Sequence, residues 1–205
     1  MNPQNIVSPK FSSQSLFQSN NPRLGLALIT LVCLFTLLLP ALVRGATITP
    51  GALTEGAISV SGGTQSWTFS ANTGDAIVVR VGDEGTTSFT PKIQLFNPSS
   101  TQIATSAGNA AAEVAVTAAA SGTFTITISD GSGANLTGSY RLTLVKTGSA
   151  ITVSPGDDGG PMTNGVMHTG TILTGDLDVW TFNAVAGDAL LARVGKITDT
   201  NSFTP

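Results

Sequence analysis

The chain of 205 residues contains a single cysteine, Cys33, and a single histidine, His168. One cysteine cannot form a disulfide within the chain, and it cannot supply the paired thiolates of a structural zinc site. The sequence also has no Gly-x-Ser-x-Gly segment, so a serine hydrolase would lack the strained turn that presents its nucleophile. These shortages predict a protein that is not an enzyme, with no catalytic residue, metal site or cofactor, and they make His168 a solvated loop residue.

Charged residues are also scarce, at 10% of the chain, and they are unevenly distributed. Residues 1–44 hold Lys10, Arg23 and Arg44 and no acid, which leaves six basic and twelve acidic residues after them, a net charge of −6. Nucleic-acid binding needs clustered Lys and Arg that displace counterions, so no nucleic-acid partner is expected. The abundance of Gly, Ser, Thr and Ala suits short strands and tight turns better than surface helices.

One long hydrophobic run is present, the twenty uncharged residues 24–43. Two interpretations remain open. A secretory signal would place Val43 and Gly45 at the −3 and −1 positions and be cleaved before Ala46. A membrane anchor is the alternative, because twenty apolar residues just span a bilayer and a long polar stretch, 1–23, precedes the run. Either way the rest of the chain is predicted to be secreted or displayed at the cell surface by the general secretory route, with membrane contact only through residues 24–43 if they are uncleaved.

The strongest pattern in the sequence is an internal repeat. Residues 67–82 read WTFSANTGDAIVVRVG and residues 180–195 read WTFNAVAGDALLARVG, with ten of sixteen positions identical at an offset of 113. The match extends in both directions, from 51–56 to 165–170 and from 88–91 to 202–205. Chance does not produce a match of this length, so the sequence predicts a tandem repeat.

Alternation of apolar and polar residues predicts the fold of the first copy. In 122–129, GTFTITIS, the apolar residues alternate with threonines, and in 139–145, SYRLTLV, they alternate with Ser139, Arg141 and Thr143. About eight such segments, separated by turn signals, are typical of an all-β, antiparallel β-sandwich. The alanine-rich stretch 110–120 is predicted to be strand and turn, because its valines recur with a period of two.

The predicted organisation has four parts, which are an N-terminal hydrophobic helix with a polar leader (1–45), a complete sandwich (48–147), a linker (148–164) and a second copy (165–205). The second copy reaches Pro205, the counterpart of Pro91, whereas the first copy continues for another 55 residues to Lys146. Half a sandwich exposes apolar faces and open strand edges. We therefore expect the natural protein to continue beyond Pro205.

Several short motifs carry a family resemblance. They are Gly-x₄-Gly, Trp-Thr-Phe, Ala-x-x-Gly-Asp-Ala, Phe-Thr-Pro, Gly-Thr-Phe-Thr-Ile and Gly-Ser-Tyr-Arg-Leu. Together they resemble the bacterial pre-peptidase C-terminal domain, which is similar to bacterial collagen-binding domains, over the whole first copy and the first half of the second. The resemblance implies a small sandwich of jelly-roll type. Such domains follow the catalytic part of secreted peptidases or form tandem arrays in surface proteins, and the second arrangement fits better because no catalytic domain precedes the sandwich.

Acidic residues are the only candidates for a metal. Asp157-Asp158 lies in the linker and Asp176-Leu-Asp178 precedes Trp180, and the resemblance to collagen-binding domains implies linker calcium sites. The first copy has Gly63-Thr-Gln65 where the second has Asp176-Leu-Asp178, so turn formation is the favoured interpretation and no metal is assigned. Asp75 and Asp188, which recur in a Gly-Asp turn, are expected to cap that turn.

Two aromatic pairs complete the set of candidates. Trp67 and Trp180 alternate with Phe69 and Phe182, so all four are predicted to lie in the core and not to form a sugar-stacking surface. The predicted function is a non-catalytic, secreted or cell-surface protein with a structural, adhesive or ligand-presenting role, whose ligand is an extracellular protein or a carbohydrate. The alternative is an accessory region of an exported hydrolase whose catalytic domain is absent from this chain. Extending the reading frame distinguishes them.

Overall fold

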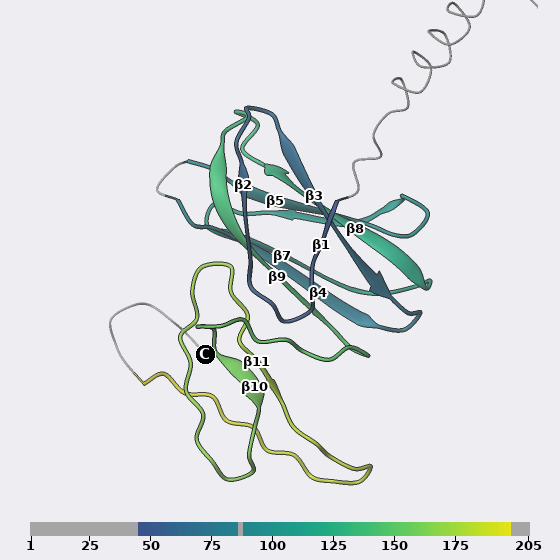
Figure 1. Ribbon diagram of the computed structural model, residues 1–205, viewed down its shortest axis with the longest axis vertical. Helices are drawn as coiled ribbons and strands as arrows, with labels where there is room; N and C mark the ends of the chain where they lie inside the picture. Colours follow the sequence, from purple (N-terminus) through teal and green to yellow (C-terminus); the bar gives the residue numbers. More distant parts are fainter. Residues whose placement is uncertain (1–44, 86–87, 198–205) are drawn as a thin grey trace, which may run out of the picture. The chain divides into compact units, whose positions relative to one another are not determined.

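The computed structural model describes residues 45–85 and 88–197, all of which belong to the second of the two units into which the chain divides, Arg44–Pro205 (Figure 1). The predicted N-terminal hydrophobic helix and cleavable signal lie outside the described residues. Within the described part of the chain, no helix is long and apolar enough to cross a membrane.

Nine strands form two facing sheets before residue 147. The strands are β1 (Ala46–Thr47), β2 (Thr54–Ile58), β3 (Thr64–Ala71), β4 (Ala76–Asp83), β5 (Pro91–Phe96), β6 (Gln102–Ala107), β7 (Ala111–Thr117), β8 (Gly122–Asp130) and β9 (Gly138–Lys146). One sheet has the order β1-β3-β8-β5-β6 and the other β2-β9-β4-β7. All neighbours are antiparallel except β1 and β3. The predicted all-β, sandwich-like fold is confirmed.

The core lies between the two sheets and is built from alternate residues of each strand. On β8, Phe124, Ile126 and Ile128 are at most 1% exposed, while the threonines between them are half-buried. Tyr140, Leu142 and Leu144 of β9 are fully buried opposite them. Full burial of one such side chain stabilises the fold by about 1.5–3 kcal/mol. The inward faces predicted for both strands are therefore confirmed. Thr143 of β9, which was predicted to face solvent, is instead 1% exposed and donates a hydrogen bond to the Gly175 carbonyl at 3.5 Å.

The alanine-rich stretch is a strand, as the period of two predicts. β7 pairs antiparallel with β4, with Val114 opposite Val79. Ala112 and Val114 are buried, whereas Glu113 and Ala115, which alternate with them, are exposed. A helix would carry these residues around its axis and could not present alternate positions to one sheet partner.

Two short strands follow the sandwich, β10 (Gly159–Pro161) and β11 (Val179–Thr181), and they pair in parallel. Gly160 lies opposite Trp180 as Ala46 of β1 lies opposite Trp67 of β3. The segment 148–164 was predicted to be a linker, yet it contributes β10 to this sheet. It also contacts the sandwich, because the Leu53 amide donates a hydrogen bond to Ser154 Oγ at 2.9 Å.

Phe182 does not lie in the core, so that part of the prediction is wrong. Its side chain is 53% exposed, whereas Phe69, its counterpart, is 4% exposed and stacks on Phe124 of β8 at 5.6 Å. Trp180 is half-buried. The physical reason is that β8 and β9, which cover the first copy's aromatic residues, have no counterpart among the described residues after β11.

Candidate functional site

Four aspartates converge where the segment after β9 meets the start of β11. One carboxylate oxygen from each of Asp157, Asp176 and Asp178 lies within 4.8 Å of the others. Asp158 is adjacent, and its Oδ2 accepts a hydrogen bond from the Thr171 amide at 2.8 Å. We call these four residues the acidic cluster. Sequence analysis identified both pairs, Asp157-Asp158 and Asp176-Leu-Asp178. It gave no signal that these pairs, about twenty residues apart, lie side by side in the fold.

Like charges and burial shape the electrostatics of the acidic cluster. Burial, followed by repulsion from Asp176, Asp158 and Asp157, raises the pKa of Asp178 to about 6. Burial and the charge of Asp176 likewise raise the pKa of Asp157. Within the described part of the chain, Asp178 Oδ1 is buried and has no hydrogen-bond partner. The cluster therefore holds more negative charge than the surrounding groups neutralise.

The chemistry of the acidic cluster suits a hard cation, but its ligand set is small. Calcium takes about six to eight oxygen ligands in proteins. Three carboxylates supply part of such a set, and two of them already serve turns. Asp157 Oδ1 accepts a bond from the Asp158 amide at 3.0 Å, and Asp176 Oδ1 accepts one from the Leu177 amide at 2.8 Å. These bonds agree with the turn role that the sequence favoured.

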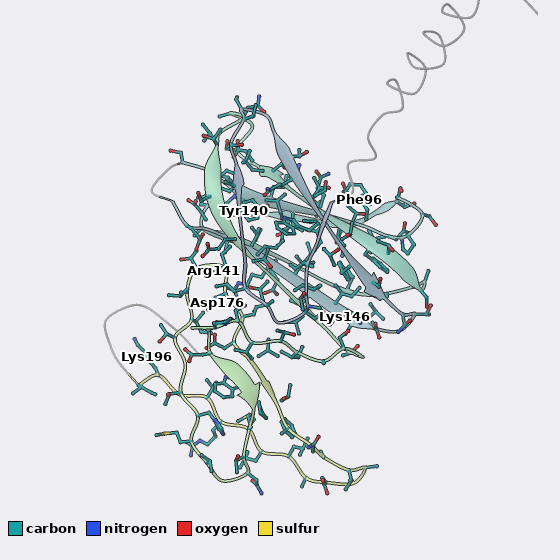
Figure 2. The ribbon with its side chains drawn as sticks, viewed as in Figure 1. Phe96, Tyr140, Arg141, Lys146, Asp176 and Lys196 are labelled. Carbon is teal, nitrogen blue, oxygen red and sulfur yellow. The ribbon has the colours of Figure 1, made fainter. Side chains whose placement is uncertain are left out.

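Arg141 connects the sandwich to this segment. Its guanidinium pairs with Glu84 at 2.5 Å and donates a hydrogen bond to the Thr174 carbonyl at 3.4 Å. Figure 2 shows Arg141 above Asp176, at the end of β9 that also carries Tyr140. Nearby, a Cβ on Gly82 would collide with the backbone of Gly175. The backbone segments around these two residues can therefore lie this close only because Gly82 has no side chain.

A second polar group lies inside the sandwich, around Tyr140. Trp67 Nε1 donates a hydrogen bond to the Tyr140 hydroxyl at 2.9 Å, and that hydroxyl donates to Gln65 Oε1. Burial raises the pKa of Tyr140 to about 12, and the bond from Trp67 opposes part of this rise. The three residues come from facing sheets, so they fix how β3 sits over β9.

The two Gly-Asp turns are alike, and both follow the expected capping role. Asp75 Oδ2 accepts a bond from the Asn72 amide at 2.9 Å, and Asp188 Oδ2 accepts one from the Val185 amide at 2.9 Å. Asp75 makes one further contact that the sequence did not reveal, an ion pair with Lys146 at 3.0 Å. The Asn72 amide and then Lys146 lower the pKa of Asp75.

His168 is placed against an aromatic ring. Its Nε2 accepts a hydrogen bond from the Thr163 amide at 3.1 Å, and its ring centroid lies 4.9 Å from that of Trp180. The sequence predicted a solvated loop histidine, whereas the side chain is half-buried. These contacts give His168 a structural role in holding the 163–168 turn beside β11.

A surface hollow of about 310 Å³ lies beside β1 and β3. Its lining is mostly small and hydroxylated, with Thr47, Thr68, Ser70 and Thr123 among its residues. Phe69 also lines it but is 4% exposed, so the hollow has no exposed aromatic face on which a sugar ring could stack.

No family model and no curated protein matches this chain. Solved structures resemble about half of it. The pre-peptidase C-terminal domain of a collagenase from Bacillus anthracis is 18% identical with a TM-score of 0.42, over 49% of this chain and 94% of that one. PliG from Aeromonas hydrophila, a periplasmic inhibitor of g-type lysozyme, is 15% identical with a TM-score of 0.42, over 51% and 96%. PliG from Salmonella Typhimurium is 17% identical with a TM-score of 0.38, over 51% and 98%. Likeness at this level assigns neither family nor function.

Proposed function

We propose that this chain is a non-catalytic, exported β-sandwich protein with a structural, adhesive or ligand-presenting role outside the cell. One observation carries the proposal. The ionisable side chains of the sandwich with the most perturbed pKa values are bound into turns and between sheets. Asp130 accepts bonds from Thr90, Ser132 and Leu136, and Tyr140 is fully buried. In an active site such groups face a cleft and a substrate.

The arrangement of two copies is part of the same proposal. Residues 165–205 are a second copy of the sandwich repeat, and both copies are of the jelly-roll type found in pre-peptidase C-terminal domains. The identity between residues 67–82 and 180–195 supports this. So does the shared pairing of Gly160 with Trp180 and of Ala46 with Trp67. Cleavage before Ala46 would release both copies from the membrane.

The ligand class favoured by the surface is protein. Exposed apolar residues gather on the segment after β11, where Phe182, Leu190 and Val194 are 53%, 63% and 77% exposed. Several exposed apolar side chains on one segment favour a polypeptide as the ligand. A carbohydrate ligand has less support, because the hollow beside β3 offers no exposed aromatic ring.

Binding of residues 46–205 to matrix-protein and glycan arrays tests the proposal. We expect saturable retention on a subset of the proteins, no time-dependent loss of the arrayed material, and lower retention of the double variant Phe182→Ser, Val194→Thr. Val60→Thr is the matched control, because Val60 is 68% exposed and lies between β2 and β3, outside that segment of the sequence. Progressive cleavage of any arrayed substrate would contradict a non-catalytic role. Sequencing the N-terminus of the exported protein checks cleavage separately, with Ala46 as the expected first residue.

A further inference from the structure

Two tight turns of the described chain share one backbone geometry, and we call them the first turn (60–63) and the second turn (173–176). In each, the fourth amide donates a hydrogen bond to the first carbonyl, at 2.8 Å in the first turn and 3.1 Å in the second. The third residue of each is a glycine with positive φ, 70° at Gly62 and 78° at Gly175. The two turns are separated by 113 positions, the offset that also relates 67–82 to 180–195. They are therefore equivalent in sequence position and in geometry.

The surroundings of the two turns differ. Gly62 is exposed, and a Cβ added there would come no closer than 3.6 Å to its nearest neighbour, Asn135. Gly175 is buried, and a Cβ added there would collide with the backbone of Gly82 on β4. Since the first turn keeps its geometry while exposed, a turn of this sequence is formed before anything covers it. Such a preorganised ligand loses little conformational entropy on docking.

The second turn lies on the outer face of the sheet that contains β4 and β9. Gly82 of β4 is the register partner of Arg141 of β9. Val81 and Leu142, which adjoin them in sequence, are fully buried in the core, so Gly82 and Arg141 belong to the opposite face. Thr143, two residues after Arg141, shares that outer face. We call Gly82, Arg141 and Thr143 the glycine notch.

The glycine notch binds two successive carbonyls of the second turn. The Arg141 guanidinium donates to the Thr174 carbonyl at 3.4 Å, and the Thr143 hydroxyl donates to the Gly175 carbonyl at 3.5 Å. Glu84 pairs with Arg141 at 2.5 Å and so orients the guanidinium. Thr143 is 1% exposed although it lies on the outer face, because the second turn covers it. Both donors reach backbone atoms, so the notch recognises the shape of a turn and not its side chains.

Gly82 serves this contact and not its own strand. It has no positive φ, so its backbone conformation does not require glycine. A glycine inside a strand weakens the strand and marks a place where another backbone comes close. A Cβ at Gly82 would collide with the backbone of Gly175. The counterpart of Gly82 at the offset of 113 is Gly195, so both Arg-Val-Gly segments have glycine at this position.

The segment 148–164 brings the second turn to the glycine notch. Its Thr152 amide donates a hydrogen bond to the Pro50 carbonyl at 3.0 Å, and its Ser154 hydroxyl oxygen accepts one from the Leu53 amide at 2.9 Å. A connection held to the sandwich in this way gives the second turn a high effective concentration at the notch. Two long hydrogen bonds and a close backbone contact therefore suffice to dock it.

We propose that the glycine notch is a docking site for the equivalent turn of a neighbouring sandwich repeat, so that consecutive repeats pack directly on one another. Its ligand is a tight turn whose third residue is a glycine with positive φ, and in this chain the occupant is the second turn. Contact of each repeat with its neighbour is the arrangement that stabilises repeat proteins. This proposal rests on the second copy proposed above.

The test uses isotopically labelled protein comprising residues 46–205. A nuclear Overhauser contact should join the Gly82 α protons to the Gly175 amide proton. Gly82→Ala should abolish this contact and speed amide exchange in 173–177 by at least about tenfold, the effect of overpacking, while the amides of β8 stay protected. Gly195→Ala is the matched control, because a Cβ on this counterpart of Gly82 meets nothing within 4 Å. It should change neither measurement.

A graft tests what the glycine notch recognises. Leu173→Val, Thr174→Ser and Asp176→Gly together give the second turn the sequence of the first, and the Overhauser contact should persist. Gly175→Ala removes the glycine with positive φ and adds a Cβ against the Gly82 backbone, so it should release the turn as Gly82→Ala does. Position 175 lies outside the first sandwich, so this variant decides the matter even if Gly82→Ala weakens the sandwich.

Unchanged exchange in 173–177 in both Gly82→Ala and Gly175→Ala would overturn the proposal. Absence of the Overhauser contact from the unmodified protein, or its loss in the graft, would overturn it as well. These measurements concern contacts within the chain, whereas the arrays measure binding of an external ligand. Failure of the docking site is therefore distinguishable from failure of the proposed function.

Discussion

Lys146 at the end of β9 and Asp75 in the turn before β4 form an ion pair at 3.0 Å across 71 positions of sequence. The Lys146 side chain is 6% exposed and that of Asp75 is 12% exposed. Asp75 also accepts a bond from the Asn72 amide, so one carboxylate holds the turn and the strand end together. The pair fixes where β9 ends relative to β4.

Lys146→Met is expected to lower the free energy of unfolding, because it leaves the Asp75 charge in a largely buried place without its cation. Urea unfolding of residues 46–205, followed by circular dichroism, measures the change. Glu113→Gln is the matched control. It breaks the Arg80–Glu113 pair, whose side chains are 34% and 48% exposed, and should change stability by less than about 0.5 kcal/mol. Equal effects of the two variants would refute a special role for the buried pair.

The same pair makes stability depend on acid. The bond from Asn72 and the charge of Lys146 lower the pKa of Asp75 below its usual value of 3.8. Because the folded-state pKa is the lower one, the stabilisation is complete above pH 3.8 and is lost as the pH falls below it. Unfolding curves at a series of pH values should show this loss in the native protein and a smaller one in Asp75→Asn. If native protein and Asp75→Asn lost the same amount of stability at low pH, the acid dependence would come from other carboxylates.

Tyr140→Phe removes a buried hydroxyl and leaves both Trp67 Nε1 and Gln65 Oε1 without their partner. We expect a cost of about 1–3 kcal/mol, the range for stranding a buried polar group. Adding Trp67→Phe and Gln65→Leu removes the stranded groups, so the triple variant should recover part of the loss. Thermal unfolding of the two variants makes the comparison, and a triple variant less stable than Tyr140→Phe would contradict it.

Tyr140 is the only tyrosine, so its ionisation can be followed directly. Burial raises its pKa to about 12 from the usual 10.0. The folded state disfavours the charged form, so the stability contributed by Tyr140 is present below pH 10 and declines as the pH rises toward 12. Absorbance at the tyrosinate band should stay flat through pH 10 in folded protein and rise there in urea. A rise at pH 10 in both states would mean that the hydroxyl is accessible.

Much of the first sandwich was predictable because its strands follow a period of two. Phe124, Ile126 and Ile128 point inward and the threonines between them outward because each strand has one face against the core. Strand order was not predictable, since β9 lies between β2 and β4 and no local pattern specifies which distant strands pair. The Asp75–Lys146 pair was missed for the same reason.

The segment 180–195 shows most clearly what local sequence does not determine. Val81 and Val194 occupy corresponding positions in segments that share ten of sixteen residues, yet one is fully buried and the other is 77% exposed. Period-two patterning states which face a residue belongs to, and burial requires a second layer to cover that face. The acidic cluster was likewise beyond prediction, because Asp157 and Asp178 meet only through the turns between them.

Asp130 organises the turn between β8 and β9. Burial alone would raise its pKa, but bonds from Ser132, Leu136 and Thr90 lower it to about 2. Asp130→Ala should destabilise the sandwich by roughly 1–2 kcal/mol at neutral pH, since these are hydrogen bonds to a charged group in a partly exposed place. The difference should shrink as the pH falls from 3.8 toward 2. Urea unfolding at pH 7 and pH 2.5 checks it, and a constant difference would exclude the charge as its source.

Asp178→Asn is expected to stabilise the segment that carries the acidic cluster. Burial and three neighbouring aspartates raise the pKa of Asp178 to about 6, so the folded state resists its ionisation. Stability contributed by this group is therefore greatest below pH 3.8 and is lost as the pH rises through 6. Above pH 6 the variant should gain roughly 1 kcal/mol after allowance for solvent screening, and near pH 4 the gain should vanish.

Hydrogen exchange of the β11 amides at pH 4 and pH 7 reports on this segment, where a global melt would mainly report on the sandwich. Asp83→Asn is the matched control, because Asp83 lies on β4 outside the acidic cluster and should show no such pH dependence. Exchange in calcium and in chelator should agree, since three carboxylates fall short of a calcium ligand set. Greater protection in calcium would instead show that a bound cation, not a proton on Asp178, relieves the repulsion.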